Sequence, residues 1–298
     1  MNINQLEVFI KVAEKMNVTE AAKALFISQP AVSKALKNLE SFLQIKLFIR
    51  DKQNGLALTD VGQEMLILAR EMKELESKML QLACQENKLL RGKVRIGSFP
   101  AASANLLPDA IGLFRTQYPQ VTIELMEGTS NQIKQWVDDR SVEIGIVASP
   151  FEPFDFKIVA HDSMAAILPE NHPLQLEREV SLEDYRNELI FCKGGHEAVV
   201  LNTLEEKGIP FHENLTVQTA ETLIHMVQKH LGIGIISRFS LSSVTHHLMI
   251  KEIVPRITRD IGLVANSFTE LTPAGKQFLN IMGQLYGAVL PQDFEFRT

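Results

Sequence analysis

The sequence is poor in cysteine: Cys84 and Cys192 are the only two in 298 residues. So few cysteines, so far apart, exclude a disulfide framework and a cysteine-based zinc site. Long apolar runs are absent too, since none approaches the about 18 residues of a membrane-spanning helix. The N-terminus lacks a basic stretch followed by an apolar core, the pattern of a secretion signal. These absences predict a cytoplasmic protein with no membrane partner.

Motifs that would mark an enzyme are also missing. The chain has no Gly-x-Ser-x-Gly, no Gly-rich phosphate loop ending in Lys-Ser or Lys-Thr, and no His-Glu-x-x-His. His225, His230, His246 and His247 have no Cys or carboxylate cluster at ligand spacing. We therefore expect no catalysis, no cofactor and no metal site. An enzyme stays a rival hypothesis because two-lobed α/β bodies, the form expected below for the C-terminal part, also host catalysis.

Charge is divided unevenly along the chain. The net charge is −6, but residues 1–58 carry eight Lys or Arg against five Asp or Glu, a balance of +3. The remaining residues therefore carry a net −9. A mildly basic head on an acidic body suits a protein that offers only its head to nucleic acid, although +3 alone is not diagnostic.

Residues 17–40 contain two short helical patterns almost back to back. The first starts near Thr19 and carries the small pair Ala21-Ala22, which lets another helix approach closely. The second has Ser28 as N-cap and Pro30 in its first turn. Its apolar core positions are Val32, Leu36 and Leu39. Two helices joined so closely must cross steeply, which predicts a helix-turn-helix that places its second helix in the major groove.

The second helix offers side chains suited to reading DNA. Gln29 can pair bidentately with an adenine edge, and Ser33, one turn further, can reach a base or a phosphate. Pro30 can meet a thymine methyl, unless it only starts the helix. Basic residues nearby suit phosphates, which add affinity without sequence preference, although Lys37 can equally be only solvated. The predicted DNA-binding residues are Thr19, Ser28, Gln29, Pro30, Ser33, Lys34, Lys37, Arg50 and Lys52.

A long helix is expected from Thr59 to about Leu90, because no Pro or Gly interrupts this stretch after Gly62. Its apolar residues alternate at steps of four and three, a heptad stripe. The stripe consists of Val61, Met65, Leu68, Met72, Leu75, Met79 and Leu82. At about 50 Å, the helix is too long to bury so narrow a stripe within its own domain. The stripe therefore predicts a homodimer on double-stranded DNA with two dyad-related half-sites, and packing on the chain's own body is the alternative.

From Gly92 onward, short apolar segments alternate with helical patterns. Strands are expected over residues 93–97, 121–125 and 143–147, and helices over residues 106–118 and 131–139 lie between them. Such alternation predicts an α/β domain with a parallel sheet wrapped by helices.

Five motifs near the N-terminus resemble the signature of the LysR-type transcriptional regulators. They are Ala21-Ala22, Ser28-Gln29-Pro30-Ala31-Val32-Ser33, Leu39-Glu40, Leu47-Phe48-Ile49-Arg50 and Leu58-Thr59-Asp60-Val61-Gly62, in order and at matching spacing. Less specific matches, such as Gly232-Ile233-Gly234-Ile235, extend the resemblance over nearly the whole chain. Two departures are Glu143, where the family usually has Asp, and Ser237-Arg238, where Pro is frequent.

The resemblance implies three parts. A winged helix-turn-helix domain spans residues 1–58, with its wing tip between Asp51 and Gly55, and a linker dimerisation helix spans residues 59–90. An effector-binding domain over residues 91–298 is expected to look like a two-lobed periplasmic solute-binding protein. Lobe 1 would cover about residues 91–161 and 267–298, and lobe 2 about residues 162–266, with the chain crossing near residues 160–163 and 265–268.

The implied function is a DNA-binding transcription regulator controlled by a small effector, assembled as a homodimer or homotetramer, with RNA polymerase as a further candidate partner. Two alternatives stay open. A ligand-independent DNA-binding repressor or architectural protein would have the same head. A redox sensor would use Cys192, yet it needs a resolving cysteine, and Cys84 belongs to the linker helix.

Ligands of α/β sheets bind beyond the carboxyl ends of strands, where helix N-termini present free N–H groups. The predicted effector-binding residues are Ser98, Phe99, Pro100, Ala101, Ser103, Thr129, Ser130, Lys193, Gly194, Gly195, His196 and Thr219. Hydroxyls, backbone amides and a lysine suit a carboxylate or another small anion. Ser103, Thr129 and Thr219 can instead be ordinary helix caps.

Overall fold

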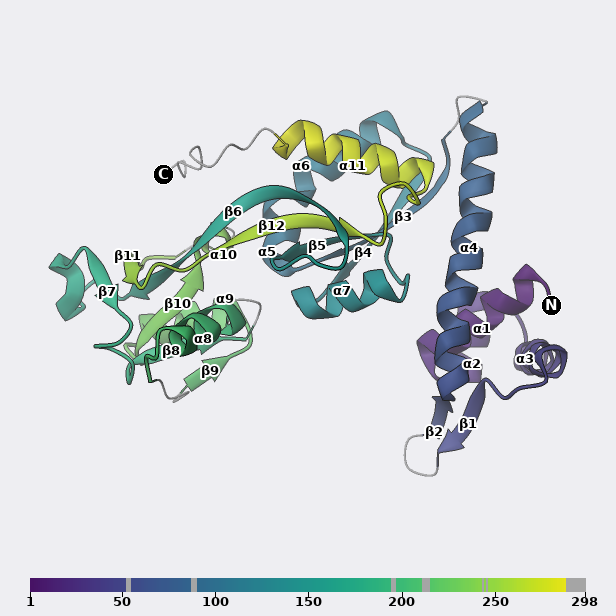
Figure 1. Ribbon diagram of the computed structural model, residues 1–298, viewed down its shortest axis with the longest axis horizontal. Coiled ribbons are helices and arrows are strands. Elements are labelled where there is room, and N and C mark those ends of the chain that lie inside the picture. The colour runs from purple at the N-terminus through teal and green to yellow at the C-terminus, as the bar shows by residue number, and fades with distance from the viewer. Residues whose placement is uncertain are drawn as a thin grey trace.

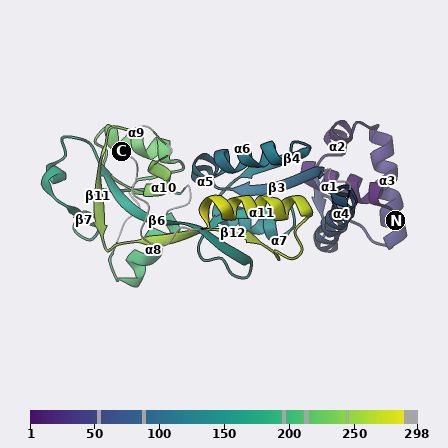
Figure 2. The ribbon, with the colours of Figure 1, turned by 90° about the horizontal axis from the view of Figure 1, so that it is seen from above.

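In the computed structural model, the described residues are 1–51, 55–86, 90–193, 197–210, 215–242, 244 and 246–287. They form an N-terminal head, one long helix and a body of two lobes (Figure 1). The head lies against one end of the long helix, lobe 1 lies beside that helix, and lobe 2 lies at the far end of the molecule (Figures 1 and 2). The chain therefore has the α/β fold with a mainly helical head that the sequence predicts.

The head consists of three helices and a two-stranded wing. Helix α1 spans Ile3–Lys15, α2 Val18–Leu25 and α3 Gln29–Leu43, and strand β1 (Phe48–Asp51) pairs antiparallel with β2 (Gly55–Leu58). Side-chain caps start the second and third helices: Asn17 accepts from the Thr19 and Glu20 amides, and Ser28 from the Ala31 amide. The helix-turn-helix and the wing are thereby confirmed, while residues 52–54 lie outside the described residues.

The long helix α4 spans Asp60–Glu86 and begins where the sequence places it, since the Thr59 hydroxyl accepts a hydrogen bond from the Gly62 amide. Its first turns belong to the head, because Leu66 and Ala69 are buried in the same core as the apolar faces of α1–α3. Leu90, the expected end, is no longer helical.

Among the described residues, one ten-stranded sheet runs through both lobes. In lobe 1, the parallel strands β3 (Gly92–Ser98), β4 (Val121–Glu127) and β5 (Ile144–Ala148) lie beside β12 (Thr258–Ala265) and the first half of β6 (Asp155–Leu168). Helices α6 (Leu107–Gln117) and α11 (Pro273–Tyr286) cover one face, and α7 (Ser130–Asp138) covers the other (Figure 1). The short helix α5 (Pro100–Asn105) follows β3.

In lobe 2, β10 (Ile233–Ser237) pairs with the second half of β6 and with the parallel strand β8 (Leu189–Cys192), which is followed by β9 (Leu215–Val217). The other elements are η1 (Pro173–Leu176), β7 (Glu179–Ser181), α8 (Glu197–Glu206), α9 (Ala220–Gln228), α10 (Arg238–Leu241) and β11 (Met249–Val254). Each lobe has its own apolar core, built on the buried side chains of these strands and helices.

The two lobes are joined by β6 and β12, which run between them side by side (Figure 2). Strand β6 pairs with β10 from Met164 onward, so it passes from lobe 1 to lobe 2 just before that residue. Strand β12 crosses at Thr258–Asp260, because Ile261 already pairs with Ala148 in lobe 1. The second crossing thus precedes residues 265–268, and residues 261–266 belong to lobe 1 instead of lobe 2. Strand β12 spans the crossing as one strand with a register shift between Ile261 and Gly262, so neither a loop nor a helix marks the crossing.

Candidate DNA-reading face, interlobe site and helix junction

Helix α3 separates its polar and apolar residues onto two faces. Val32, Leu36 and Leu39 are buried in the head core, as the sequence predicts. The opposite face is exposed and carries Gln29, Pro30, Ser33, Lys34 and Lys37. The fold does not use these side chains for packing, so they are available to an external partner.

The remaining DNA-binding candidates surround α3. Thr19 and Ser28 are exposed, and the Ser28 hydroxyl caps α3 at 3.4 Å from the Ala31 nitrogen. Arg50 lies in wing strand β1, and Lys52 falls outside the described residues. The head thus brings most of the predicted set together around the N-terminal half of α3.

The heptad stripe of α4 is largely uncovered in the single chain. Leu68, Leu75 and Met79 are 51%, 55% and 72% exposed, and Met72 and Leu82 are also exposed. Val61 and Met65, near the head, are half-buried. The chain's own body therefore does not bury the stripe, contrary to the alternative left open by the sequence.

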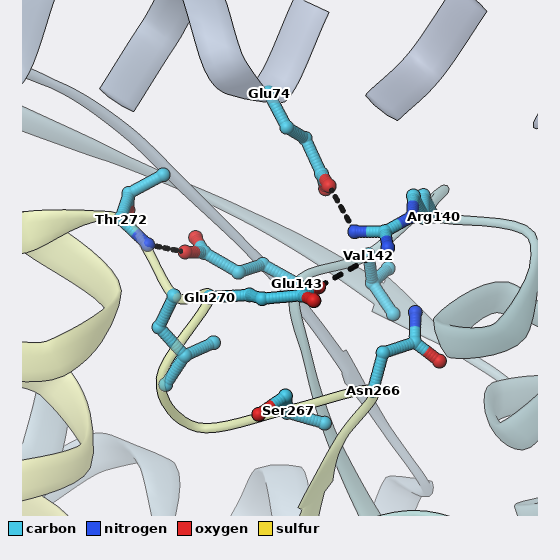
Figure 3. Close-up of a pocket in the computed structure, with 10 residues that line it drawn as sticks. Glu74, Arg140, Val142, Glu143, Asn266, Ser267, Glu270 and Thr272 are labelled. Carbon is cyan, nitrogen blue, oxygen red and sulfur yellow. Dashed lines mark hydrogen bonds and ion pairs between the residues drawn. The ribbon is translucent and has the colours of Figure 1, made fainter. Parts of the chain in front are cut away.

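The other side of α4 carries polar residues that contact lobe 1. The Arg95 guanidinium lies 2.9 Å from one Glu74 carboxylate oxygen, and the Arg140 guanidinium lies 3.1 Å from the other. Arg140 also reaches Glu270, and Arg70 pairs with Asp139 at 3.0 Å. We call Arg70, Glu74, Arg95, Asp139, Arg140 and Glu270 the junction cluster. In Figure 3, Glu74 points from α4 toward Arg140, and Glu270 approaches Arg140 from the other side.

A buried amide extends this contact beyond the charges. Gln81, on the same side of α4, is 1% exposed. Its Oε1 accepts a 2.9 Å hydrogen bond from the Ala274 amide at the start of α11, and its Nε2 donates to the Lys93 carbonyl of β3. One side chain of α4 therefore satisfies backbone groups of two lobe 1 elements.

Next to the junction cluster lies a small pocket of about 20 Å³, lined by residues that include Glu74, Arg140, Glu143 and Glu270. It has room for about one water-sized group. The Glu143 carboxylate accepts a 2.5 Å hydrogen bond from the Thr272 amide at the N-cap of α11 (Figure 3). Burial raises the pKa of Glu143, and the nearby Glu74 raises it further, while burial also raises the pKa of Glu74.

The raised pKa of Glu143 makes the stability of lobe 1 depend on pH. Because the pKa of Glu143 in the folded state lies above the ordinary 4.5, folding favours the protonated carboxyl. The free energy of unfolding therefore falls as the pH rises from 4.5 through the raised pKa. We expect Glu143→Gln, whose amide oxygen can still accept from Thr272, to unfold at a higher temperature than the parent at pH 8. The difference in unfolding temperature between this variant and the parent, measured by calorimetry, should narrow as the pH falls toward 4.5. Exposed Glu124, paired with Lys93, is the control as Glu124→Gln, and equal effects of both substitutions would contradict the assignment.

The predicted effector residues lie at strand ends that face one another between the lobes. Strands β3, β4 and β5 are parallel and end toward lobe 2, because β5 and β6 both run antiparallel to β12. Strands β8 and β9 run parallel to β10, which is antiparallel to β6, so they end toward lobe 1. The carboxyl ends of β3 and β4 therefore face those of β8 and β9 across the space between the lobes.

Several hydroxyls in these loops have structural partners. Thr129 caps α7 and Thr219 caps α9, as ordinary N-caps do, and Ser98 is buried and donates to the Phe99 carbonyl. Ser130 accepts from the Ala148 amide at 3.0 Å. The Ser103 hydroxyl differs, because it is buried and has no hydrogen-bond partner among the described residues.

The other predicted effector residues differ in how much of them the structure describes. Pro100 and Ala101 begin α5, Lys193 is exposed just after β8, and Gly194, Gly195 and His196 lie outside the described residues. The predicted effector residues therefore fall into two sets, one at the strand ends of lobe 1 and one at those of lobe 2. Only part of the lobe 2 set lies within the described residues.

A buried polar hub is centred on the crossing strands β6 and β12 and was not predicted. Asp162 of β6 accepts hydrogen bonds from the Arg259 Nε at 2.9 Å, the Ser237 hydroxyl at 2.7 Å and the Phe239 amide at 3.1 Å. The Arg259 guanidinium lies over the Phe99 ring, 5.7 Å from its centroid. The Asn105 amide of α5 donates to the Phe239 carbonyl at 2.6 Å, so the hub also ties lobe 2 to lobe 1.

Both domains of the chain match models of known families. Residues 3–63 match the bacterial regulatory helix-turn-helix protein, lysR family, and residues 87–286 match the LysR substrate binding domain. This chain belongs to the LysR family. Among curated relatives, the uncharacterized HTH-type transcriptional regulator YoaU of Bacillus subtilis (strain 168) is 60% identical over 95% of this chain and 98% of its own. The HTH-type transcriptional regulator YvbU of the same strain, also uncharacterized, is 37% identical over 97% of this chain and 100% of its own.

Solved structures of full-length LysR-family regulators share this fold. A full-length OxyR variant from Pseudomonas aeruginosa superposes with a TM-score of 0.74 at 20% identity, over 95% of this regulator and 94% of that chain. Full-length CbnR in complex with its target DNA superposes with a TM-score of 0.64 at 20% identity, over 95% and 99% of the two chains. At such identities the likeness establishes the fold.

Other features of this LysR-family regulator bear on the rival hypotheses. Cys192 is buried in β8, and Cys84 is a half-buried free cysteine of α4. Across the described part of the chain, no helix is both long and apolar enough to cross a membrane. The same residues contain no group of three or more His, Cys, Asp or Glu side chains able to hold a metal ion.

Proposed function

We propose that this regulator binds promoter DNA through the exposed face of α3, and that a small effector taken up between its lobes changes this binding and hence transcription. The observation that carries the DNA part is the division of α3 into a buried apolar face and an exposed face with Gln29, Ser33, Lys34 and Lys37. An amide and hydroxyl at the helix start suit base edges, and the lysines suit phosphates. The wing residues Arg50 and Lys52 are proposed as further phosphate contacts.

Two substitutions on α3 test this assignment. Gln29→Ala should weaken binding to the specific site by about 1–3 kcal/mol and relax base preference at one position per half-site, because it removes a bidentate base contact. Lys37→Ala should weaken binding to all sequences and flatten the salt dependence, because it removes a phosphate contact. Titrations of specific and random duplexes at several salt concentrations measure both effects. Equal losses on specific and random DNA from both variants would contradict the assignment.

We further propose that two chains pair through the α4 stripe, with Val61, Met65, Leu68, Met72, Leu75, Met79 and Leu82 at the interface. Support comes from the exposure of five of these seven side chains in the single chain. Leaving so much apolar surface in water is unfavourable, and its heptad spacing suits a second helix. A pair carries two heads, which fits a DNA site with two half-sites, and pairs of dimers would give the tetramer.

We infer that the effector is a carboxylate or another small anion bound between the lobes. The proposed contacts are those predicted from the sequence, and the Ser103 hydroxyl, which is buried with no hydrogen-bond partner among the described residues, supports them. The amides at the starts of α7 and α9 and the Lys193 ammonium add groups that favour negative charge. Domain limits of 1–58, 59–90 and 91–298, a cytoplasmic location and contact with RNA polymerase belong to the same proposal.

The single tryptophan, Trp136, offers a direct test of the effector site. It lies on α7, and a Cβ atom added to Gly128, beside the end of β4, would come within 2.7 Å of its ring. Titrating the full-length protein with acetate, succinate and benzoate should change Trp136 fluorescence saturably for at least one of them. Acetamide and benzamide are the neutral controls. If the amides change the fluorescence as the carboxylates do, the effector site does not select its ligand by charge. A DNA footprint that no carboxylate changes would favour the ligand-independent alternative.

A further inference from the structure

The covalent path from head to body is short and leaves α4 at Glu86. The chain enters β3 at Gly92, so residues 87–91 make the connection. Beyond this connection, α4 and lobe 1 are held together by ion pairs and hydrogen bonds. Noncovalent contacts between α4 and lobe 1 therefore decide whether the two move together.

The N-terminal half of α4 is fixed to the head. Leu66 and Ala69 are buried in the head core, and the Lys73 ammonium lies 3.9 Å from Glu7 of α1. Removing these side chains from the core would leave cavities, so this half of the helix cannot turn independently of the head.

The same turns of α4 also hold lobe 1. Arg70 and Glu74 flank Lys73 in sequence and make the junction cluster contacts with Asp139, Arg95 and Arg140. The side chains of Glu74 and Arg140 are only 17% and 18% exposed, so water screens their pairing poorly. Taking one partner away would leave a poorly solvated charge, which makes this contact costly to open.

The two attachments overlap along the helix, so no free segment of α4 separates head from body. We propose that the junction cluster is a latch that makes the head, α4 and lobe 1 of one chain a single rigid unit. When the latch opens, lobe 1 is free to move relative to α4. Lobe 1 then sets the direction of the DNA-reading head while the latch is closed, whichever effector the protein binds.

Distance measurements by electron paramagnetic resonance test the latch in the full-length protein. Spin labels are placed on exposed positions of the head and lobe 1, as Ser41→Cys and Thr116→Cys, in a Cys84→Ser background. Excess unlabelled chain ensures that most labelled assemblies carry one labelled copy. The parent should give one narrow distance distribution. Glu74→Arg, which sets a cation against Arg95 and Arg140, should replace it with a broad or longer one.

Matched variants separate the latch from general damage to α4. Glu76→Arg is the control, because Glu76 pairs with Lys73 of its own helix, so it should keep the narrow distribution. Arg140→Gln removes the cation from the lobe 1 side and should broaden the distribution as Glu74→Arg does. A broad distribution in the parent, or narrow ones in both Glu74→Arg and Arg140→Gln, would overturn the latch. The readout needs neither DNA nor effector, so it can fail while the proposed function holds.

Discussion

Replacing Leu75 and Met79 together with aspartate should turn the regulator into a monomer and weaken its binding to a promoter with two half-sites by about 10²–10⁴-fold. These side chains are the most exposed of the stripe, at 55% and 72%. Charges at core positions of a coiled coil must be desolvated on pairing, which removes the gain from burying the stripe. Each head would then bind its half-site alone, without the high local concentration that a linked second head provides.

Analytical ultracentrifugation at micromolar concentration measures the assembly, and titration of duplexes with one or two half-sites measures the binding. Leu80→Asp is the control, because Leu80 is 63% exposed but lies outside the stripe. It should leave the dimer and its DNA affinity unchanged. Dissociation by Leu80→Asp to the same degree, or a double variant that stays dimeric, would refute the stripe as the interface.

Asp162→Ala should destabilise the body by about 3–5 kcal/mol, the cost of removing one partner from a buried ion pair. Arg259 and Asp162 have side chains only 5% and 1% exposed, so water cannot replace the lost carboxylate. The substitution also removes the acceptor for the Ser237 hydroxyl and the Phe239 amide. Because Phe239 accepts from Asn105 of α5, contact between the lobes should loosen as well.

Urea unfolding followed by circular dichroism measures the loss. Asp260→Ala is the control on the neighbouring crossing strand, since Asp260 pairs with His161 where both side chains are about 40% exposed. An exposed pair contributes about 0–1 kcal/mol, so the control should change little. Similar midpoints for Asp162→Ala and the parent would show that the hub does not hold the body together.

The head and the stripe could be predicted because their signals are local. Helix caps such as Ser28, apolar spacing such as Val32, Leu36 and Leu39, and the heptad steps of α4 depend on residues close in sequence. The same holds for the strand and helix alternation of the body. These elements therefore appear in the structure where the sequence analysis expects them.

The features that escaped prediction are made by residues distant in sequence. The junction cluster joins Glu74, Arg140 and Glu270, and the hub joins Asp162, Ser237 and Arg259, so no local pattern marks either. The available signal was weak: Asp162 and Arg259 share their strands with other charged residues, such as Lys157 and Asp260, and nothing local in the sequence marks them as buried. Glu143, noted as a departure from the usual Asp, proved to be half-buried beside the junction cluster.

The two sides of α4 have a consequence for any pair of chains. Residues two positions apart on a helix lie roughly 200° around it, as Met72 and Glu74 do, so the side that holds lobe 1 largely opposes the stripe. In a dimer paired through the stripe, the two α4 helices would form a central coiled coil, and the two bodies would lie on its opposite outer sides. Neither body would then cover the interface between the helices. A rotation of either body would be passed along the rigid α4 helix to the DNA-reading head of the same chain, and the length of the helix would amplify the displacement of that head.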